Sequence, residues 1–91
     1  MATEQIRLLI RGHVQGVFYR KFAAEAANTL ELKGFVRNLA DGRVELVAQG
    51  EKEKLLAILQ WCHEGSPQAK VEEIDSTWTT NLQPFQSFQI R

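Results

Sequence analysis

The sequence predicts an α+β fold in which two helices pack on one face of a mainly antiparallel sheet. Three observations lead to this prediction. The chain has 91 residues, which is the length of one domain spanning 1–91. Its hydrophobic content of 44% is enough for one core without disulfides. Segments in which apolar residues alternate are separated by segments in which they recur at helical spacing, so strands and helices should follow one another along the chain.

A strand and a helix open the predicted fold. Residues 6–10 alternate in the manner of a strand with one buried face, and this strand should end at Gly12. From residue 20 to about residue 32, alanine is frequent and the apolar residues recur at helical spacing, which favours a helix. The apolar stripe expected on this helix consists of Phe22, Ala23, Ala26, Ala27 and Leu30.

A hairpin should follow the first helix. Residues 33–39 form its first predicted strand, and residues 44–48 alternate as its second. Between them Asp41-Gly42 is a strong signal for a tight turn. Gly50 should end the hairpin.

A second helix and two strands complete the fold. Residues 51–63 carry acidic side chains in the first turn and an apolar stripe, and a Gly-Ser-Pro run stops the helix. Residues 71–80 and 85–90 are the last predicted strands. The alternation slips between Val71 and Ile74, which predicts a bulge or a bend there.

The order of these elements is that of a ferredoxin-like split βαβ sandwich, βαββαβ plus a short final strand. A helical crossover joins the first two strands, so they should run parallel to each other. Their carboxyl ends then lie at the same end of the sheet. We therefore expect the loop after Ile10 to lie near Asn38.

Composition and charge exclude several classes of protein. Eleven Lys and Arg balance eleven Asp and Glu, so the chain does not offer the broad basic surface that nucleic acid or anionic lipid requires. The single cysteine, Cys62, cannot form an internal disulfide or a cysteine-rich zinc site. The N-terminus lacks the pattern of a signal peptide, and no apolar run approaches the roughly 20 residues of a membrane span. We expect a cytoplasmic protein with no membrane contact.

The charges are nevertheless distributed unevenly along the chain. Residues 1–43 hold seven basic and four acidic side chains, and residues 44–91 hold four basic and seven acidic ones. An anion site should therefore lie in the first half.

The segment from Gly12 to Arg20 is the strongest candidate for that anion site. It links a strand to a helix, and its two glycines let backbone amides turn inward, as in an anion cradle. Arg20 would lie in the first helical turn, where a cation opposes the helix dipole unless an anion binds there. The segment lacks the Gly-Lys-Ser/Thr of a nucleotide P-loop and the G-x-G-x-x-G of a dinucleotide site. An ordinary glycine-containing connection with a surface arginine has the same spacing, and Asn38 alone could be an ordinary turn asparagine.

Two segments of the chain resemble the signature motifs of the acylphosphatase family. The first motif, hydrophobic-x-G-x-V-Q-G-V-x-F-R, departs only at Tyr19, where the family usually has Phe or Met, and this change should add a hydroxyl near the loop. The residues that match it are Ile10, Gly12, Val14, Gln15, Gly16, Val17 and Arg20. The second motif, G-F-V-[KR]-N-x-x-x-G-x-V-x-x-x-x-x-G, is matched by Gly34, Phe35, Val36, Arg37, Asn38, Gly42, Val44 and Gly50. Length, element order and the closing Phe88, Ile90 and Arg91 also fit, so the resemblance covers nearly the whole chain.

This resemblance implies a hydrolase for acyl phosphates that needs no metal and no cofactor. Arg20 would hold the phosphoryl oxygens, and Asn38 would position the attacking water. The amides expected to bind the phosphoryl group together with Arg20 are those of Gln15, Gly16, Val17, Phe18 and Tyr19. Neither motif supplies a base, and our hypothesis is that the substrate phosphate accepts the water's proton. The partner implied is a small acyl phosphate, with no nucleic acid and no membrane, and a monomer is expected.

Other residues with reactive or aromatic side chains have simpler structural explanations. We expect His13 to be an exposed, variable position, His63 to complement the dipole of the second helix, and Cys62 to be an inert core thiol. Of the three acidic residues Glu72, Glu73 and Asp75, two should face solvent, so they resemble a paired-carboxylate site only superficially. The remaining residues considered, Trp61 and Trp78, should pack in the core or at an edge.

Two alternatives without turnover remain at this stage. A ferredoxin-like module could bind single-stranded RNA on its open sheet face, which the fragment Lys33-Gly34-Phe35-Val36 suggests. A second alternative keeps the anion site as a sensor of phosphorylated metabolites. Zero net charge argues against RNA, and the presence of both Arg20 and Asn38 argues against a sensor.

Overall fold

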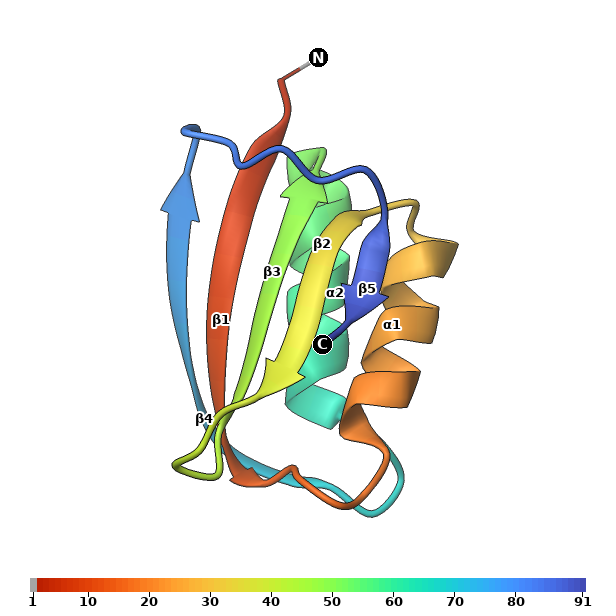
Figure 1. The fold of residues 1–91 in the computed structure, drawn as a ribbon, viewed down its shortest axis with the longest axis vertical. Helices are drawn as coiled ribbons and strands as arrows, with labels where there is room; N and C mark the ends of the chain where they lie inside the picture. Colours follow the sequence, from red (N-terminus) through yellow and green to blue (C-terminus); the bar gives the residue numbers. More distant parts are fainter. Residues whose placement is uncertain (1) are drawn as a thin grey trace.

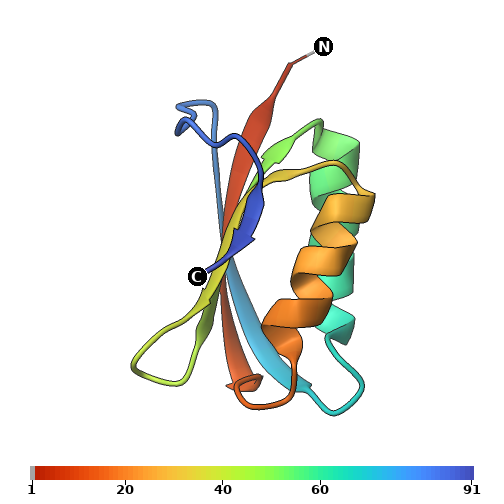
Figure 2. The ribbon, with the colours of Figure 1, turned by 45° about the vertical axis from the view of Figure 1, so that its right-hand side comes forward.

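The computed structural model describes residues 2–91, and they form the predicted two layers. Five strands make one sheet in the order β4-β1-β3-β2-β5 (Figure 1). Both helices cover one face of this sheet, and the other face is open (Figure 2). The elements are β1 (Glu4–His13), α1 (Tyr19–Thr29), β2 (Lys33–Asn38), β3 (Val44–Gly50), α2 (Lys52–Glu64), β4 (Lys70–Thr79) and β5 (Phe88–Ile90).

The sheet topology confirms the predicted fold class. β3 lies between β1 and β2 and pairs with both in antiparallel fashion, so β1 and β2 run parallel to each other without touching. β4 is antiparallel to β1, and only the short β5 adds a parallel pairing, with β2. The carboxyl ends of β1 and β2 therefore lie at the same end of the sheet, as the sequence predicted.

Period-two alternation decides which strand residues form the core. In β1, the side chains of Ile6, Leu8 and Ile10 are fully buried beneath the helices. The intervening side chains of Arg7 and Leu9 face the open side. The core is completed from the helices and the other strands chiefly by Tyr19, Ala23, Ala27, Val36, Val44, Leu46, Ala48, Leu55, Ile58 and Cys62.

The predicted bulge is present between β1 and β4. Arg11 pairs with Glu73, but the next residue, Gly12, pairs with Val71, so Glu72 is the extra residue of β4. Gly12 has a φ of 137°, and a Cβ at this position would collide with the backbone of Lys70. Glycine is therefore required for β4 to approach this closely, and β1 continues past the predicted end to His13.

The first helix ends three residues earlier than predicted, at Thr29. The amide of Leu32 donates to the carbonyl of Ala27, and the amide of Glu31 donates to the carbonyl of Asn28, which together form a Schellman motif. Glu31 takes the left-handed position with a φ of 58°, where glycine is usual, and for this reason no glycine signalled the end of the helix.

The buried stripe of α1 also differs from the prediction. Phe22 is exposed, and the helix instead buries residues shifted around its axis. Tyr19 begins this stripe because its ring packs between the two helices against Trp61, with ring centroids 5.3 Å apart. The buried residues of α1 are Tyr19, Ala23, Ala24 and Ala27.

Candidate active site

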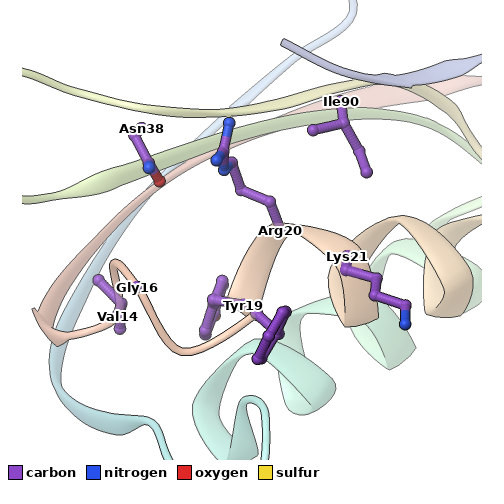
Figure 3. Close-up of a pocket in the computed structure, with 8 residues that line it drawn as sticks. Val14, Gly16, Tyr19, Arg20, Lys21, Asn38 and Ile90 are labelled. Carbon is purple, nitrogen blue, oxygen red and sulfur yellow. The ribbon is translucent and has the colours of Figure 1, made fainter.

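A pocket of about 300 Å³ lies where the loop after β1 meets the end of β2 (Figure 3). The loop wraps the start of α1, and Asn38 projects from β2 toward it. The loop after β1 and the end of β2, which the sequence predicted to lie close together, therefore form a cavity between them. Its lining residues are Val14, Gly16, Phe18, Tyr19, Arg20, Lys21, Asn38 and Ile90.

Buried side chains anchor this loop to the core. Val14 and Val17 are both buried in the core, and the hydroxyl of Ser66 donates a 2.8 Å hydrogen bond to the carbonyl of Val17. Gly16 and Phe18 both take positive φ values, 76° and 61°, and the chain bends throughout residues 15–18. The loop is thus fixed in a tight curve at the N-terminus of α1.

The amides of this curve have no main-chain partners. Within residues 2–91, no amide from Gln15 to Lys21 donates to a main-chain carbonyl, and the first bond of the turn runs from the amide of Phe22 to the carbonyl of Phe18. Phe18 at the N-cap gives no side-chain hydrogen bond to the helix. Unpartnered amides at a helix N-terminus carry partial positive charge, so this end of α1 can accept an anion.

Arg20 adds a full positive charge to the same pocket. In Figure 3 its guanidinium extends away from α1 toward the end of β2, where Asn38 lies. Its Nη1 donates a 3.0 Å hydrogen bond to the main-chain oxygen of Arg91. In the described part of the chain, no Asp or Glu side chain lies within 4.0 Å of Arg20, so no acidic side chain neutralises its charge.

Asn38 contributes a hydrogen-bond acceptor that receives no hydrogen bond from the protein. Its Oδ1 is buried, and it is the one buried side-chain oxygen or nitrogen in residues 2–91 that makes no hydrogen bond. Figure 3 shows this side chain directed at the space between the loop and Arg20. A buried polar atom of this kind costs free energy unless water or a ligand bonds to it.

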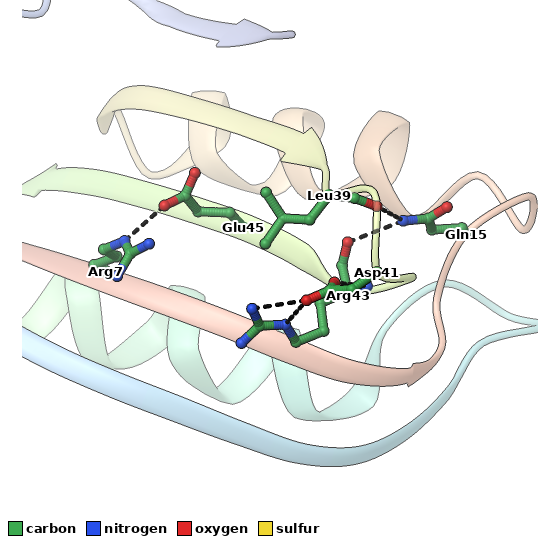
Figure 4. Close-up of polar contacts among 6 residues, drawn as sticks. All are labelled: Arg7, Gln15, Leu39, Asp41, Arg43 and Glu45. Carbon is green, nitrogen blue, oxygen red and sulfur yellow. Dashed lines mark hydrogen bonds and ion pairs between the residues drawn. The ribbon is translucent and has the colours of Figure 1, made fainter.

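The side chain of Gln15 ties the loop to the turn that follows β2. Its Nε2 donates to the carbonyl of Leu39 at 2.8 Å and to the carbonyl of Arg43 at 3.0 Å (Figure 4). From the sequence, only the main-chain amide of Gln15 was expected to have a role, in binding the phosphoryl group. The tether connects residues 24 and 28 positions apart, and no local pattern of the sequence indicates such a contact.

The hydroxyl of Tyr19 does not lie beside the loop, contrary to the prediction. It donates a 2.8 Å hydrogen bond to the carbonyl of Cys62 in α2, inside the core. Burial, together with the neighbouring Cys62, raises the pKa of this phenol above its ordinary value. Tyr19 therefore joins the two helices, and its hydroxyl is kept out of the pocket.

The remaining candidates lie outside the pocket. Burial raises the pKa of the Cys62 thiol to about 12, so this cysteine is protonated at neutral pH. His13 and His63 are exposed. All three acidic residues of β4 are exposed too, and two of them lie 3.4 and 3.5 Å from Arg11. Within residues 2–91, no three His, Cys, Asp or Glu side chains gather as metal ligands would.

A second polar cluster occupies the open face of the sheet. Glu45 is only 3% exposed, and its carboxylate accepts a 2.6 Å hydrogen bond from Arg7 and another from Arg37 (the Arg7 bond is drawn in Figure 4). Burial alone would raise the pKa of Glu45, but the hydrogen bonds and charges of the two arginines outweigh it and lower the pKa. We call Glu45, Arg7 and Arg37 the open-face cluster.

Comparison with known proteins gives a consistent result. The acylphosphatase family model matches residues 6–90, which include every residue that lines the pocket. An acylphosphatase of Marinobacter nauticus is 45% identical over 89 residues, covering 98% of this chain and 97% of that protein. The crystal structure of acylphosphatase from Bacillus subtilis has a TM-score of 0.94 at 36% identity and covers 97% of this chain and 98% of its own. An acylphosphatase from Coxiella burnetii has a TM-score of 0.93 at 36% identity, covering 99% and 94%.

Proposed function

The chain belongs to the acylphosphatase family of enzymes, which hydrolyse acyl phosphates to a carboxylate and inorganic phosphate, and we propose that the pocket at the end of the sheet performs this reaction. In this proposal Arg20 and the loop amides from Gln15 to Tyr19 bind the phosphoryl group. Asn38 positions the water that attacks it. The substrate is a small acyl phosphate.

Binding of the phosphoryl group follows from the positive charge on two sides of the pocket. The loop amides and the N-terminus of α1 supply partial charges, and Arg20 supplies a full one that no acidic side chain of the described residues neutralises. A phosphoryl group in transfer spreads negative charge over its three outer oxygens, and fixed donors around them stabilise the transition state. The curve of the loop fixes these donors before the substrate arrives.

Asn38 is suited to hold the water. Its buried Oδ1 can accept a hydrogen bond, and a water that donates one there keeps a lone pair directed toward the cradle. The water's oxygen forms a bond to phosphorus while the bond from phosphorus to the acyl oxygen breaks, and that oxygen departs with the electron pair as a carboxylate. Positioning of this kind supplies much of the acceleration in phosphoryl transfer.

The proton balance of the step needs no protein base. The attacking water loses one proton, and a phosphoryl oxygen of the substrate takes it up, so the products are the carboxylate and a protonated phosphate. A carboxylate is a weak base, and it leaves without help from a strong general acid. We therefore propose catalysis without metal or cofactor.

The observation that carries this proposal is the unpartnered Oδ1 of Asn38, which is buried and directed into the same pocket as Arg20. The open-sheet alternative of RNA binding has no such support. Phe35, the aromatic residue of the suggested RNA fragment, is covered by Phe85 and by the guanidinium of Arg91, which lies 4.2 Å from its ring centroid. It is therefore not free to stack on a base.

The test is hydrolysis of benzoyl phosphate by the purified protein in EDTA, beside a phosphomonoester and ATP. We expect turnover of the acyl phosphate alone, with inorganic phosphate as an inhibitor, since phosphate would occupy the cradle. Activity that disappears in EDTA would contradict the metal-free proposal. Equal turnover of the phosphomonoester would show that the pocket does not depend on a carboxylate leaving group.

We further propose that the protein acts as a monomer in the cytoplasm and binds no nucleic acid. No helix in the described residues is long and apolar enough to cross a membrane. The one cysteine is a buried free thiol, which is consistent with a reducing compartment. Size-exclusion chromatography with light scattering tests the monomer, and a labelled RNA of mixed sequence titrated at low salt tests nucleic-acid binding.

A further inference from the structure

Phe18 holds an aromatic ring in solvent beside the phosphate cradle. Its side chain is 70% exposed, more than that of any other large hydrophobic residue in 2–91. Its backbone is left-handed, with a φ of 61°, which is an uncommon conformation for a bulky residue. The fold neither buries this ring nor relaxes its backbone, so packing does not account for a phenylalanine at this position.

The ring of Phe18 borders two cavities. One is the pocket that contains Arg20 and Asn38. The other is an adjoining cleft of about 210 Å³, whose apolar walls come from the loop, from α1 and from the loop before β4. The residues that line this cleft are Val17, Phe18, Phe22, Pro67 and Gln68.

Phe22 extends the apolar surface by one helical turn. It is itself exposed, and it lines the same cleft as Phe18. Pro67 lines this cleft too. We call Phe18, Phe22 and Pro67 the apolar ledge; no acidic side chain lines the ledge or the phosphate pocket beside it.

We propose that the apolar ledge binds the acyl group of the substrate and favours acyl phosphates with aromatic or large apolar acyl groups. This inference rests on the proposed function. When the loop holds the phosphoryl group, the acyl carbon is only one oxygen away from phosphorus, so the acyl group must lie at the mouth of the pocket. Phe18 forms part of that mouth and leads directly into the cleft.

The chemistry of the ledge matches such a group. An aromatic acyl group can stack against the ring of Phe18 or Phe22 and removes apolar surface of both partners from water. An acetyl group carries only one methyl group, so it can bury much less apolar surface on the ledge. The ledge shares a residue with the phosphate pocket, and this continuity favours the substrate's own acyl group over a separate protein partner as its occupant.

The test compares kcat/KM for benzoyl phosphate and acetyl phosphate in the wild type and in two variants, Phe18→Ala and Phe18→Asn. Asparagine tolerates the left-handed backbone, so the second variant removes the ring without adding strain. We expect the benzoyl-to-acetyl ratio to fall about tenfold in both, the size of effect that one apolar contact gives in substrate discrimination. The matched control is Leu56→Ala, which removes an exposed apolar side chain of α2 that lines neither cavity and should leave the ratio unchanged.

A ratio that stays unchanged in both Phe18 variants would overturn the inference. The inference would also be overturned if the benzoyl-to-acetyl ratio fell in Ile90→Ala but not in the Phe18 variants. Ile90 lines the pocket from β5, so that result would mean that the acyl group contacts Ile90 and not the ledge. Inorganic phosphate has no acyl group, so its dissociation constant, followed by NMR shifts of the loop amides, separates the two proposals. If phosphate does not bind and neither substrate turns over, the proposed function fails. If phosphate binds and both substrates turn over but the ratio does not move, only the acyl site fails.

Discussion

The open-face cluster and the pocket at the end of the sheet both contain arginines, but they are built in opposite ways. In the open-face cluster, Glu45 accepts a hydrogen bond of 2.6 Å from each of two arginines, Arg7 and Arg37. In the pocket, Arg20 has no Asp or Glu side chain within 4.0 Å in the described chain, and the buried Oδ1 of Asn38 has no donor. One cluster satisfies its charges within the fold, and the other leaves them for a ligand.

This contrast separates structural from functional polar groups in a small domain. Removing a partner from the satisfied cluster should lower the free energy of unfolding and spare turnover. Removing a group from the unsatisfied pocket should strongly reduce turnover and spare stability, because that group makes few contacts in the folded protein. Each substitution below tests one side of this contrast.

The largest effect is expected from Arg20→Ala. Loss of a full charge aimed at the phosphoryl group should lower kcat/KM for benzoyl phosphate by at least about 10³-fold, since even one neutral oxyanion donor is worth about 10² to 10³. Phosphate inhibition should weaken too, and thermal unfolding should change little. The matched control is Arg7→Ala, which removes the same charge from the open-face cluster and should keep activity while unfolding at lower temperature. Equal losses of activity in the two variants would contradict the contrast.

Asn38→Ala should lower kcat by about 10²-fold while inorganic phosphate still inhibits at the same concentration, because the proposed partner of Oδ1 is water. Unfolding by urea should show no loss of stability, since the substitution removes a buried acceptor that lacks a donor. Parallel loss of turnover and of phosphate affinity would instead place Asn38 on the phosphoryl group.

Glu45→Gln tests the contribution of the open-face cluster to stability. The substitution removes a buried charge and weakens two charge-assisted hydrogen bonds, while Arg7 and Arg37 remain partly in water. We expect the free energy of unfolding to fall by about 2 kcal/mol, the usual value of hydrogen bonds to charged groups. Urea titration measures this, and kcat/KM for benzoyl phosphate should not change. An unchanged unfolding midpoint would show that the cluster adds no net stability.

Acid should weaken the open-face cluster in a definite direction. The pKa of Glu45 is lower in the folded protein than in the unfolded chain, so its contribution is present above the unfolded pKa of about 4.3 and is lost as pH falls through the folded pKa. The wild type should therefore lose its advantage over Glu45→Gln as pH drops below about 4. Urea titrations of both proteins at pH 7 and at the acid end test this, and a constant difference would contradict it.

The smallest effect is a gain of stability in the pocket loop. Phe18→Asn relieves a left-handed phenylalanine, because asparagine adopts this backbone conformation more readily. We expect about 0.5 to 1 kcal/mol more stability, seen as a rise in Tm. A lower Tm would mean that the exposed ring does contribute to packing.

Several features of the fold and the pocket could be predicted from the sequence because they depend on neighbouring residues. Period-two and helical spacing located the strands and helices to within a few residues, and the slipped alternation near Val71 predicted the bulge that the structure contains. The rule that a helical crossover makes two strands parallel predicted that Asn38 lies beside the loop. The predicted end of α1 was wrong because the left-handed residue that ends the helix is Glu31, and only glycine or asparagine at that position would have signalled the end.

The direction and partner of each individual side chain became known only from the folded structure. The Tyr19 hydroxyl bonds to Cys62, 43 residues away, and not to the loop; Gln15 holds the turn after β2; and Arg20 bonds to the main chain of Arg91, 71 residues away. The motif singled out Arg20, but nothing in the sequence showed that Arg7 and Arg37 meet Glu45 from neighbouring strands. A local pattern sets which face of an element is buried, but the partner that meets a side chain there depends on how distant elements dock. The scaffold, and the placement of the loop and Asn38 at one end of the sheet, therefore follow from patterns in the sequence, whereas the docking of distant elements sets which charges are neutralised and which remain for a substrate.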